Sequence, residues 1–163
     1  MAITKIQSES LNLADNYDFT GTVTGAGDTT KPSFYAKANT GQSISNATET
    51  VLQFNNEIFD SNSCFDTGTY RFTPTTAGKY YIFGQYACNT STDCFQAFYI
   101  YKNASLQTQL INRNFDTDSV FVATVFDMNG SSDYAELRYY QESGGAITLS
   151  NTQHMGFGGF KIG

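Results

Sequence analysis

Residues 70–83 constrain the fold most, because they read as two β-strands joined by a turn. Pro74 has no N–H to give to a strand ladder and therefore ends the first strand. Gly78 supplies the backbone freedom that the turn requires. Successive side chains of the second strand point to opposite faces, and both faces are apolar, with Tyr80, Ile82 and Tyr86 on one and Tyr81, Phe83 and Ala87 on the other. A strand that is apolar on both sides must be covered on both sides, so we expect a sandwich that assembles.

The composition favours one all-β domain plus an appendage. Of 163 residues, 15% are charged and 15% are aromatic, a balance that suits half-buried strands. The net charge is −6 and the nine Lys and Arg residues are scattered, which argues against binding nucleic acid through clustered phosphate contacts. No apolar run has the length of a signal peptide or a membrane helix. We therefore expect synthesis in a cytoplasm and no membrane span.

Beyond Pro32, short strand patterns alternate with turn signals. The expected strands cover residues 33–38, 50–54, the pair within 70–88, 95–102, 119–127, 134–141, 147–150 and 155–162. Residues 55–68 read as a long polar loop and 129–133 as a strong turn. Leu106 and Leu110 are four apart, which also fits a helix, but the β-rich neighbours favour a strand over 106–112. Roughly eight to ten strands without a helix predict an antiparallel jelly-roll β-sandwich.

The first 31 residues differ from the rest and are expected to form an extended N-terminal attachment arm. Their apolar side chains fall on one parity, which is typical of extended structure: Leu11, Leu13, Tyr17, Phe19 and Val23. Gly25 and Gly27 follow as a flexible joint. The sequence thus divides into an arm, residues 1–31, and a head domain, residues 32–163.

Several motifs of the head occur in the order of a known family. They are Phe65-Asp66-Thr67-Gly68 before Phe72-Thr73-Pro74, Gly78-Lys79-Tyr80-Tyr81-Ile82-Phe83, Tyr101-Lys102-Asn103, the turn from Asn129 to Tyr134, and Phe157-Gly158-Gly159-Phe160-Lys161-Ile162. Together they resemble the jelly-roll heads of the first component of complement and of the tumour necrosis factor superfamily. The collagen stalk or transmembrane stem of that family has no counterpart here.

In place of a stalk, residues 1–6 and 13–23 resemble the short attachment arms of tailed-bacteriophage virion-surface proteins, such as fibres and decoration proteins. This resemblance implies a virion location, assembly in the host cytoplasm, and contact with other virion proteins through the arm.

The sequence offers little for catalysis or metal binding. His154 is the only histidine and has no evident paired nucleophile. Asp116, Asp118, Asp127 and Asp133 leave open a glycosidase-like carboxylate pair or a calcium site. Acids in sandwich loops are usually solvated, however, and no loop carries a dense ligand set. We therefore predict no enzymatic activity, no cofactor and no metal.

The three cysteines, Cys64, Cys88 and Cys94, do not have the spacing of metal ligands. Cys88 and Cys94 flank a candidate hairpin tip, so their spacing permits a disulfide between them. Synthesis in a cytoplasm favours free thiols instead.

The strands at residues 79–88 and 155–162 predict a homotrimer interface, with Tyr80, Tyr81, Phe83, Phe157 and Phe160 as its residues. Polar loops rich in Asn, Ser, Thr and Tyr are adaptable recognition surfaces. Their candidate binding residues are Asn62, Asp93, Asp116, Asp118 and Asp133.

We therefore expect a non-enzymatic virion structural protein, namely a phage fibre, tip or capsid decoration. A host-surface glycan and a host-surface protein both stay open as its further binding partner. Two alternatives stay open: a cellular lectin-like or cytokine-like binding module, and a sandwich glycan hydrolase. Presence in purified particles separates the first expectation from the cellular module. Turnover of polysaccharide would identify the hydrolase.

Overall fold

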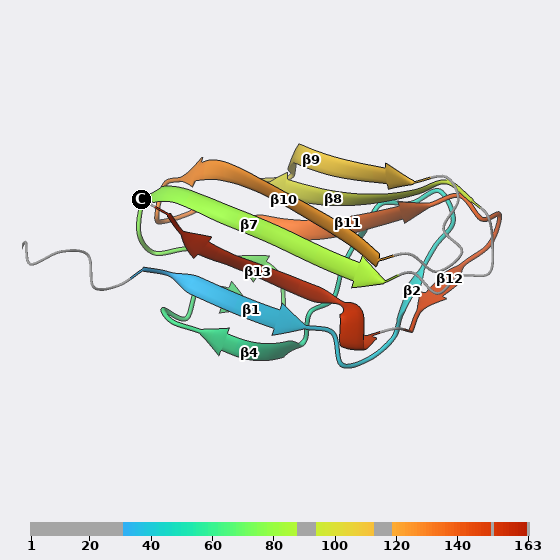
Figure 1. The fold of residues 1–163 in the computed structure, drawn as a ribbon, viewed down its shortest axis with the longest axis horizontal. Helices are drawn as coiled ribbons and strands as arrows, with labels where there is room; N and C mark the ends of the chain where they lie inside the picture. Colours follow the sequence, from blue (N-terminus) through green and yellow to red (C-terminus); the bar gives the residue numbers. More distant parts are fainter. Residues whose placement is uncertain (1–30, 88–93, 113–118, 151, 163) are drawn as a thin grey trace, which may run out of the picture.

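The computed structural model describes residues 31–87, 94–112, 119–150 and 152–162, which form a sandwich of two antiparallel sheets (Figure 1). The first sheet has the strand order β10 (Ser119–Met128), β7 (Gly78–Ala87), β13 (Gly156–Lys161), β1 (Ser33–Lys37) and β4 (Asn56–Asp60). The second has the order β5 (Phe65–Asp66), β6 (Arg71–Phe72), β11 (Ala135–Gln141), β8 (Gln96–Lys102) and β9 (Ser105–Asn112), with β3 (Thr50–Val51) also on β11. The expected antiparallel jelly-roll sandwich is confirmed.

A two-stranded sheet and a short 3₁₀ turn complete the described part of the chain. β2 (Gln42–Ile44) pairs with β12 (Ile147–Leu149) as a small sheet, and the 3₁₀ turn η2 (Thr152–His154) precedes β13. The N-terminal arm, including Leu11, Leu13, Tyr17, Phe19 and Val23, lies outside the described residues apart from Lys31.

The core lies between the two sheets and is rich in aromatic rings. Phe34 stacks on Phe72 with ring centroids 4.3 Å apart and meets the edge of Phe157 at 4.8 Å. Phe72 in turn contacts Tyr80 at 5.6 Å. These rings come from both sheets and are fully buried. Burial of each such side chain stabilises the fold by roughly 1.5–3 kcal/mol before ordering costs.

Residues 70–83 do supply two strands, as expected, but these strands belong to different sheets. β6 ends at Phe72, before Pro74, and pairs with β5 and β11. β7 begins at Gly78 and pairs with β10 and β13. The turn between them therefore crosses from one layer of the sandwich to the other, which places the two strands on opposite sides of the core.

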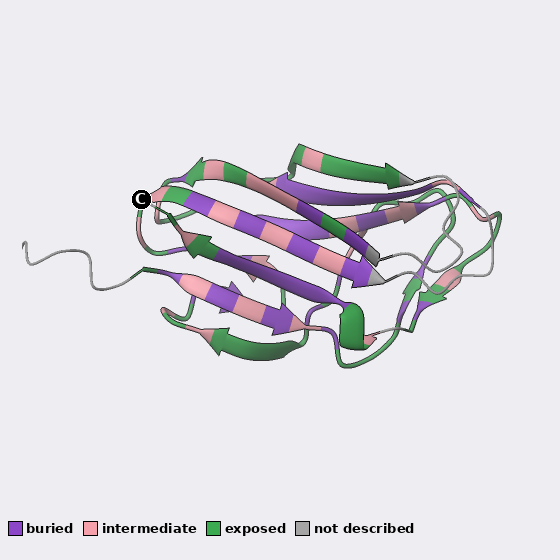
Figure 2. Cartoon of the chain, in the orientation of Figure 1, coloured by how far each residue is buried: buried purple, intermediate pink, exposed green. Residues whose placement is uncertain are grey.

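Along β7 the predicted alternation is confirmed. Tyr80, Ile82 and Tyr86 are at most 2% exposed and face the core, whereas Tyr81 and Phe83 lie on the outer face of the sheet. The alternation is visible as a change of colour along the strand in Figure 2. β9 confirms the strand expected at residues 106–112, extended by one residue at its start.

The expectation of a long loop at residues 55–68 was wrong. This segment contains β4, on the edge of the first sheet, and the two-residue strand β5. Ile58 and Phe59 are consecutive apolar residues, so no alternation marks β4, and its pairing with β1 shifts register between Tyr35 and Ala36. The Asp60 carboxylate then shapes the return by accepting from the N–H groups of Asn62 and Phe65 at 3.2 and 2.6 Å.

Candidate functional site

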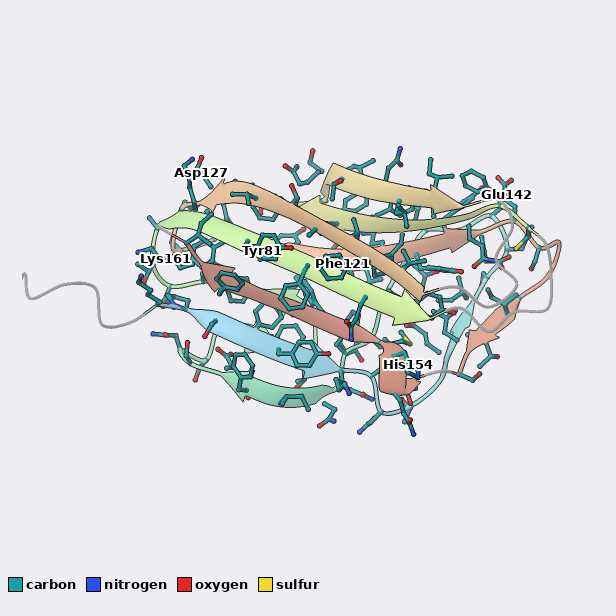
Figure 3. All side chains as sticks on the ribbon, in the orientation of Figure 1. Tyr81, Phe121, Asp127, Glu142, His154 and Lys161 are labelled. Atoms are coloured by element: carbon teal, nitrogen blue, oxygen red, sulfur yellow. The ribbon has the colours of Figure 1, made fainter. Side chains whose placement is uncertain are left out.

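The outer face of the first sheet carries a continuous group of aromatic side chains, here called the aromatic face. Its members come from four neighbouring strands and are Tyr35, Tyr81, Phe83, Phe121 and Phe160. The Phe83 ring lies 6.2 Å from Tyr35, 6.0 Å from Tyr81 and 6.0 Å from Phe121, centroid to centroid, and Tyr81 lies 5.4 Å from Phe160. Figure 3 shows Tyr81 and Phe121 on this side of the sandwich. The rings thus form one apolar surface.

Two glycines of β13 allow the rings to lie flat on the sheet. Phe83 and Tyr35 are both cross-strand neighbours of Gly158. A Cβ atom on Gly158 would lie 2.3 Å from Cζ of Phe83, and one on Gly156 would lie 2.5 Å from the hydroxyl oxygen of Tyr35. The rings therefore occupy the space that side chains of β13 would otherwise fill, a known way for aromatic residues to cover glycine in a sheet.

Much of this surface is exposed in the single chain. The exposed fractions of Phe121 and Phe160 are 54% and 44%, and Val125 on the edge strand β10 is 48% exposed. Partial burial among the neighbouring rings raises the pKa of the Tyr35 phenol by desolvation. Toward one end of the face, Nζ of Lys79 lies 3.0 Å from the Asp127 carboxylate. Contiguous apolar patches of this kind are typical of interaction surfaces.

The predicted trimer-interface residues divide between the two sides of the sheet. Tyr81, Phe83 and Phe160 lie on the aromatic face. Tyr80 and Phe157 are fully buried within the sandwich, so the prediction that their side chains form an intersubunit interface was wrong. They lie on the opposite parity of β7 and β13, and their rings fill the core between the sheets.

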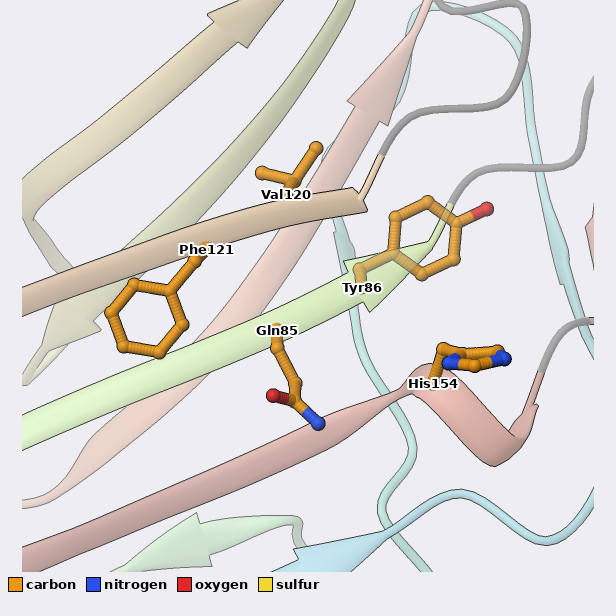
Figure 4. Close-up of a pocket in the computed structure, with 5 residues that line it drawn as sticks. All are labelled: Gln85, Tyr86, Val120, Phe121 and His154. Carbon is orange, nitrogen blue, oxygen red and sulfur yellow. The ribbon is translucent and has the colours of Figure 1, made fainter.

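A shallow pocket lies at one end of the aromatic face, where β7 and β10 approach η2 (Figure 4). It has a volume of about 160 Å³ and is lined by Gln85, Tyr86, Val120, Phe121 and His154. The Gln85 amide donates to the Tyr35 hydroxyl at 3.2 Å. None of these lining residues is a carboxylate or a nucleophile paired with His154, so they supply neither an acid–base pair nor a catalytic triad.

The outer face of the second sheet is chemically different and is here called the arginine–glutamate face. Its centre is Glu136, whose side chain is fully buried although it points away from the core. Its Oε1 accepts from Nε of Arg138 at 2.8 Å and from Nη2, and its Oε2 accepts from Nε of Arg71 at 2.8 Å. Three N–H donors therefore satisfy this carboxylate.

Aromatic rings support both guanidinium groups. Arg71 lies over the Tyr134 ring at 4.0 Å from its centroid, and Arg138 lies over Tyr101 at 4.2 Å. Burial opposes the charge on Arg138, but the hydrogen bonds and charge of Glu136 outweigh it and raise the pKa of Arg138. Burial, and then the hydrogen bond that its hydroxyl donates to Glu49 at 2.6 Å, raise the pKa of Tyr101 to about 12.

Of the predicted binding-loop residues, the structure describes Asn62 and Asp133. Asn62 Oδ1 accepts from the Ser61 hydroxyl at 3.0 Å. Asp133 accepts from Lys102, from the Asn103 amide and from the Asn129 N–H at 2.9, 2.7 and 2.9 Å. Hydrogen bonds from Asn103 and Lys102 lower the pKa of Asp133. These contacts fix the turn before β11. Asp93, Asp116 and Asp118 lie outside the described residues.

The carboxylates and cysteines considered from the sequence lie partly within the described residues. Asp127 is exposed beside Lys79 and Asp133 is held by Lys102, so neither is poised as a free member of a glycosidase pair. No group of three His, Cys, Asp or Glu side chains within the described ranges could hold a metal ion. Cys88 lies outside the described residues, so both alternatives for it, a disulfide with Cys94 and a free thiol, stay open. Nor does the described part contain a helix with the length and hydropathy needed to span a membrane.

No protein-family model and no curated protein matches the chain, but solved structures match its fold. Murine APRIL at pH 5.0 has a TM-score of 0.64 at 10% sequence identity, over 82% of this chain and 100% of that one. The globular domain of zebrafish complement 1qA has a TM-score of 0.59 at 16% identity, over 82% and 98%. Eiger TNF from S. frugiperda has a TM-score of 0.60 at 14% identity, over 82% and 92%.

The described part of the chain therefore has the jelly-roll fold shared by complement 1q and tumour necrosis factor domains, which confirms the family resemblance at the level of fold. Identities of this size establish the fold and do not assign a role.

Proposed function

We propose that the chain is a non-enzymatic binding head that assembles as a homotrimer and is displayed on a virus particle as a fibre, tip or capsid decoration. The observation that carries the proposal is the aromatic face. Its rings are held flat over Gly156 and Gly158, and Phe121 and Phe160 are about half exposed. Covering such a surface with a second copy removes apolar area from water, the main favourable term in protein association.

A ring of three copies suits the distribution of this apolar area. The middle of the aromatic face lies on β7 and β13, whereas Phe121 and Val125 lie on β10, at the edge of the first sheet. If the edge of one copy packs on the middle of the next, the contact joins two different patches. Such a head-to-tail contact closes into a ring when the rotation permits it. The three-fold form agrees with the fold, for which a trimer is typical.

The virion role is supported by the resemblance of residues 1–6 and 13–23 to the attachment arms of tailed-phage surface proteins. The alternating apolar side chains of the arm would be covered by virion proteins, for example by pairing with an exposed sheet edge. Three arms on one trimer would attach together and so strengthen a marginal individual contact through avidity.

Two measurements test the two parts of the proposal. Light scattering of the purified full chain should give the mass of a trimer at micromolar concentration, and a monomer would overturn the assembly. Deletion of residues 1–25 should leave a trimeric head that no longer joins tailed particles. Normal incorporation of that truncated head would overturn the role of the arm. Absence of the full chain from purified particles would instead favour a cellular lectin-like or cytokine-like module, and turnover of polysaccharide would favour the hydrolase.

A further inference from the structure

We propose that the arginine–glutamate face contains a binding site for an acidic glycan, centred on Arg71, which would hold the carboxylate of a uronic-acid-type sugar. The inference rests on the proposed function in one respect. Assembly through the aromatic face would cover the first sheet and leave the outer face of the second sheet open to a ligand.

Arg71 is held in place yet keeps its terminal donors. Its Nε donates to the buried Glu136 carboxylate at 2.8 Å, and its plane rests on Tyr134. Its Nη atoms have no hydrogen-bond partner within the described part of the chain, and its side chain is 39% exposed. A guanidinium group fixed in this way has little entropy left to lose on binding, and its fork of N–H groups matches a carboxylate.

The acidic groups around Arg71 are already occupied. Asp66, its cross-strand neighbour on β5, accepts from the Gly68 N–H at 2.7 Å and from the Thr69 hydroxyl at 2.9 Å. Glu49 accepts from the Tyr101 hydroxyl and lies 3.6 Å from Arg138. These carboxylates are turned toward other donors, so the free guanidinium edge is left as the group that a ligand anion would complement.

The surroundings of Arg71 favour a sugar over a peptide. Tyr134, which lies against Arg71, supplies a phenol, and the Thr69 hydroxyl oxygen can accept a hydrogen bond while its proton is donated to Asp66. A sugar ring offers many hydroxyls with which such groups exchange hydrogen bonds. A protein partner would instead need a buried apolar anchor and a pocket to receive it. The apolar residues of the aromatic face lie on the other sheet, on the opposite side of the core.

The test uses tetragalacturonate as the probe and isothermal titration of the full chain at low ionic strength. Tetragalacturonate should bind, its methyl ester should not, and added salt should weaken the binding because the contact is ionic and exposed. Arg71→Gln should weaken binding about tenfold or more, and Arg71→Lys should lose most of the affinity while keeping a positive charge beside Glu136. Failure of tetragalacturonate to bind, or equal binding of the ester, would overturn the proposal.

A matched control is Lys79→Gln, which removes an exposed cation from the first sheet. It should leave the affinity unchanged, and an equal loss there would show a general charge effect and overturn the site. Tetraglutamate is the peptide probe, and binding as tight as that of tetragalacturonate would overturn the choice of a sugar. Light scattering on the same samples separates the outcomes. Trimers that do not bind overturn this site alone, whereas monomers overturn the proposed assembly.

Discussion

Both sheets carry aromatic rings on their outer faces, and the two faces differ in how far those rings are shielded from water. On the first sheet, aromatic rings lie over glycines and about half of the Phe121 and Phe160 surface stays in contact with water. On the second sheet, Tyr99 and Tyr101 are only 8% and 7% exposed, because they pack in one cluster with Ala97, Phe95 and Tyr140. Arg138 covers one ring of this face and Glu136 neutralises the guanidinium.

This contrast shows how a chain with few charges distributes them. An exposed apolar face gains free energy when another surface covers it, and it loses that gain if a charge is introduced. A face of paired charges gains little from being covered by another protein surface, since its charged groups would lose solvent. The first sheet is therefore suited to assembly, and the second is suited to remain in water, where the Nη groups of Arg71 stay open to a small polar ligand.

The largest expected effect is the loss of assembly on placing a charge in the middle of the aromatic face. Phe83→Asp removes the ring that contacts Tyr35, Tyr81 and Phe121 and would bury an unpaired carboxylate at each contact between copies. Light scattering should show a folded monomer at the micromolar concentrations at which the proposed wild-type trimer would form. Gln109 lies on β9 of the second sheet, opposite Tyr99. Gln109→Asp adds the same charge there and should leave assembly unchanged. A trimeric Phe83→Asp variant would contradict the contrast.

The next largest effect should come from the second sheet and act on stability. Glu136→Gln keeps the shape of the side chain but leaves Arg71 and Arg138 without the carboxylate that pairs them. We expect a loss of about 3 kcal/mol in the free energy of unfolding, measured by chemical denaturation. Asp127→Asn breaks an exposed pair instead and should cost less than about 1 kcal/mol. Similar losses of unfolding free energy in the two variants would mean that burial of Glu136 does not increase the contribution of its ion pairs to stability.

A smaller effect should follow from disturbing the flatness of the aromatic face. In Gly158→Ala the new Cβ would meet the end of the Phe83 ring, which must swing outward. The monomer should stay folded, because the ring lies on the surface, while association should weaken about tenfold, or ~1.4 kcal/mol. In Gly145→Ala no atom lies within 4 Å of the new Cβ, and no change in association is expected. Sedimentation at decreasing concentration measures the association of both variants. If Gly158→Ala associates as tightly as the wild-type chain, the position of the Phe83 ring does not affect assembly.

The sequence predicts the fold and the first face better than the second. The two-residue period of β7 separates Tyr81 and Phe83 from Tyr80, but both sets are apolar, so it does not tell which set faces the core. In β13, glycines on both parities leave the same choice undecided for Phe157 and Phe160. The arginine–glutamate face was missed because Arg71 and Glu136 are 65 residues apart in sequence, and only the pairing of β6 with β11 brings them together. Glu136 and Arg138 on alternate positions of one strand are the sequence signal that could have indicated a charged outer row.

The smallest expected effect is on the titration of the Tyr101 phenol, which tests how well the second face is shielded from water. The ordinary phenol pKa is 10.0, and burial followed by the Glu49 hydrogen bond raises the pKa of Tyr101 to about 12. The folded chain thus holds this proton more tightly than the unfolded chain. The resulting stabilisation is fully present below pH 10.0 and is lost as the pH rises toward about 12. The difference in tyrosinate absorbance between the wild-type chain and Tyr101→Phe should isolate this late titration. Glu49→Gln should shift it to lower pH, because it removes the charge and the hydrogen-bond acceptor but not the burial. A Tyr101 that titrates near pH 10.0 in the folded chain would show that water reaches the phenol, and the two outer faces would then differ less than the packing of Arg138 over Tyr101 indicates.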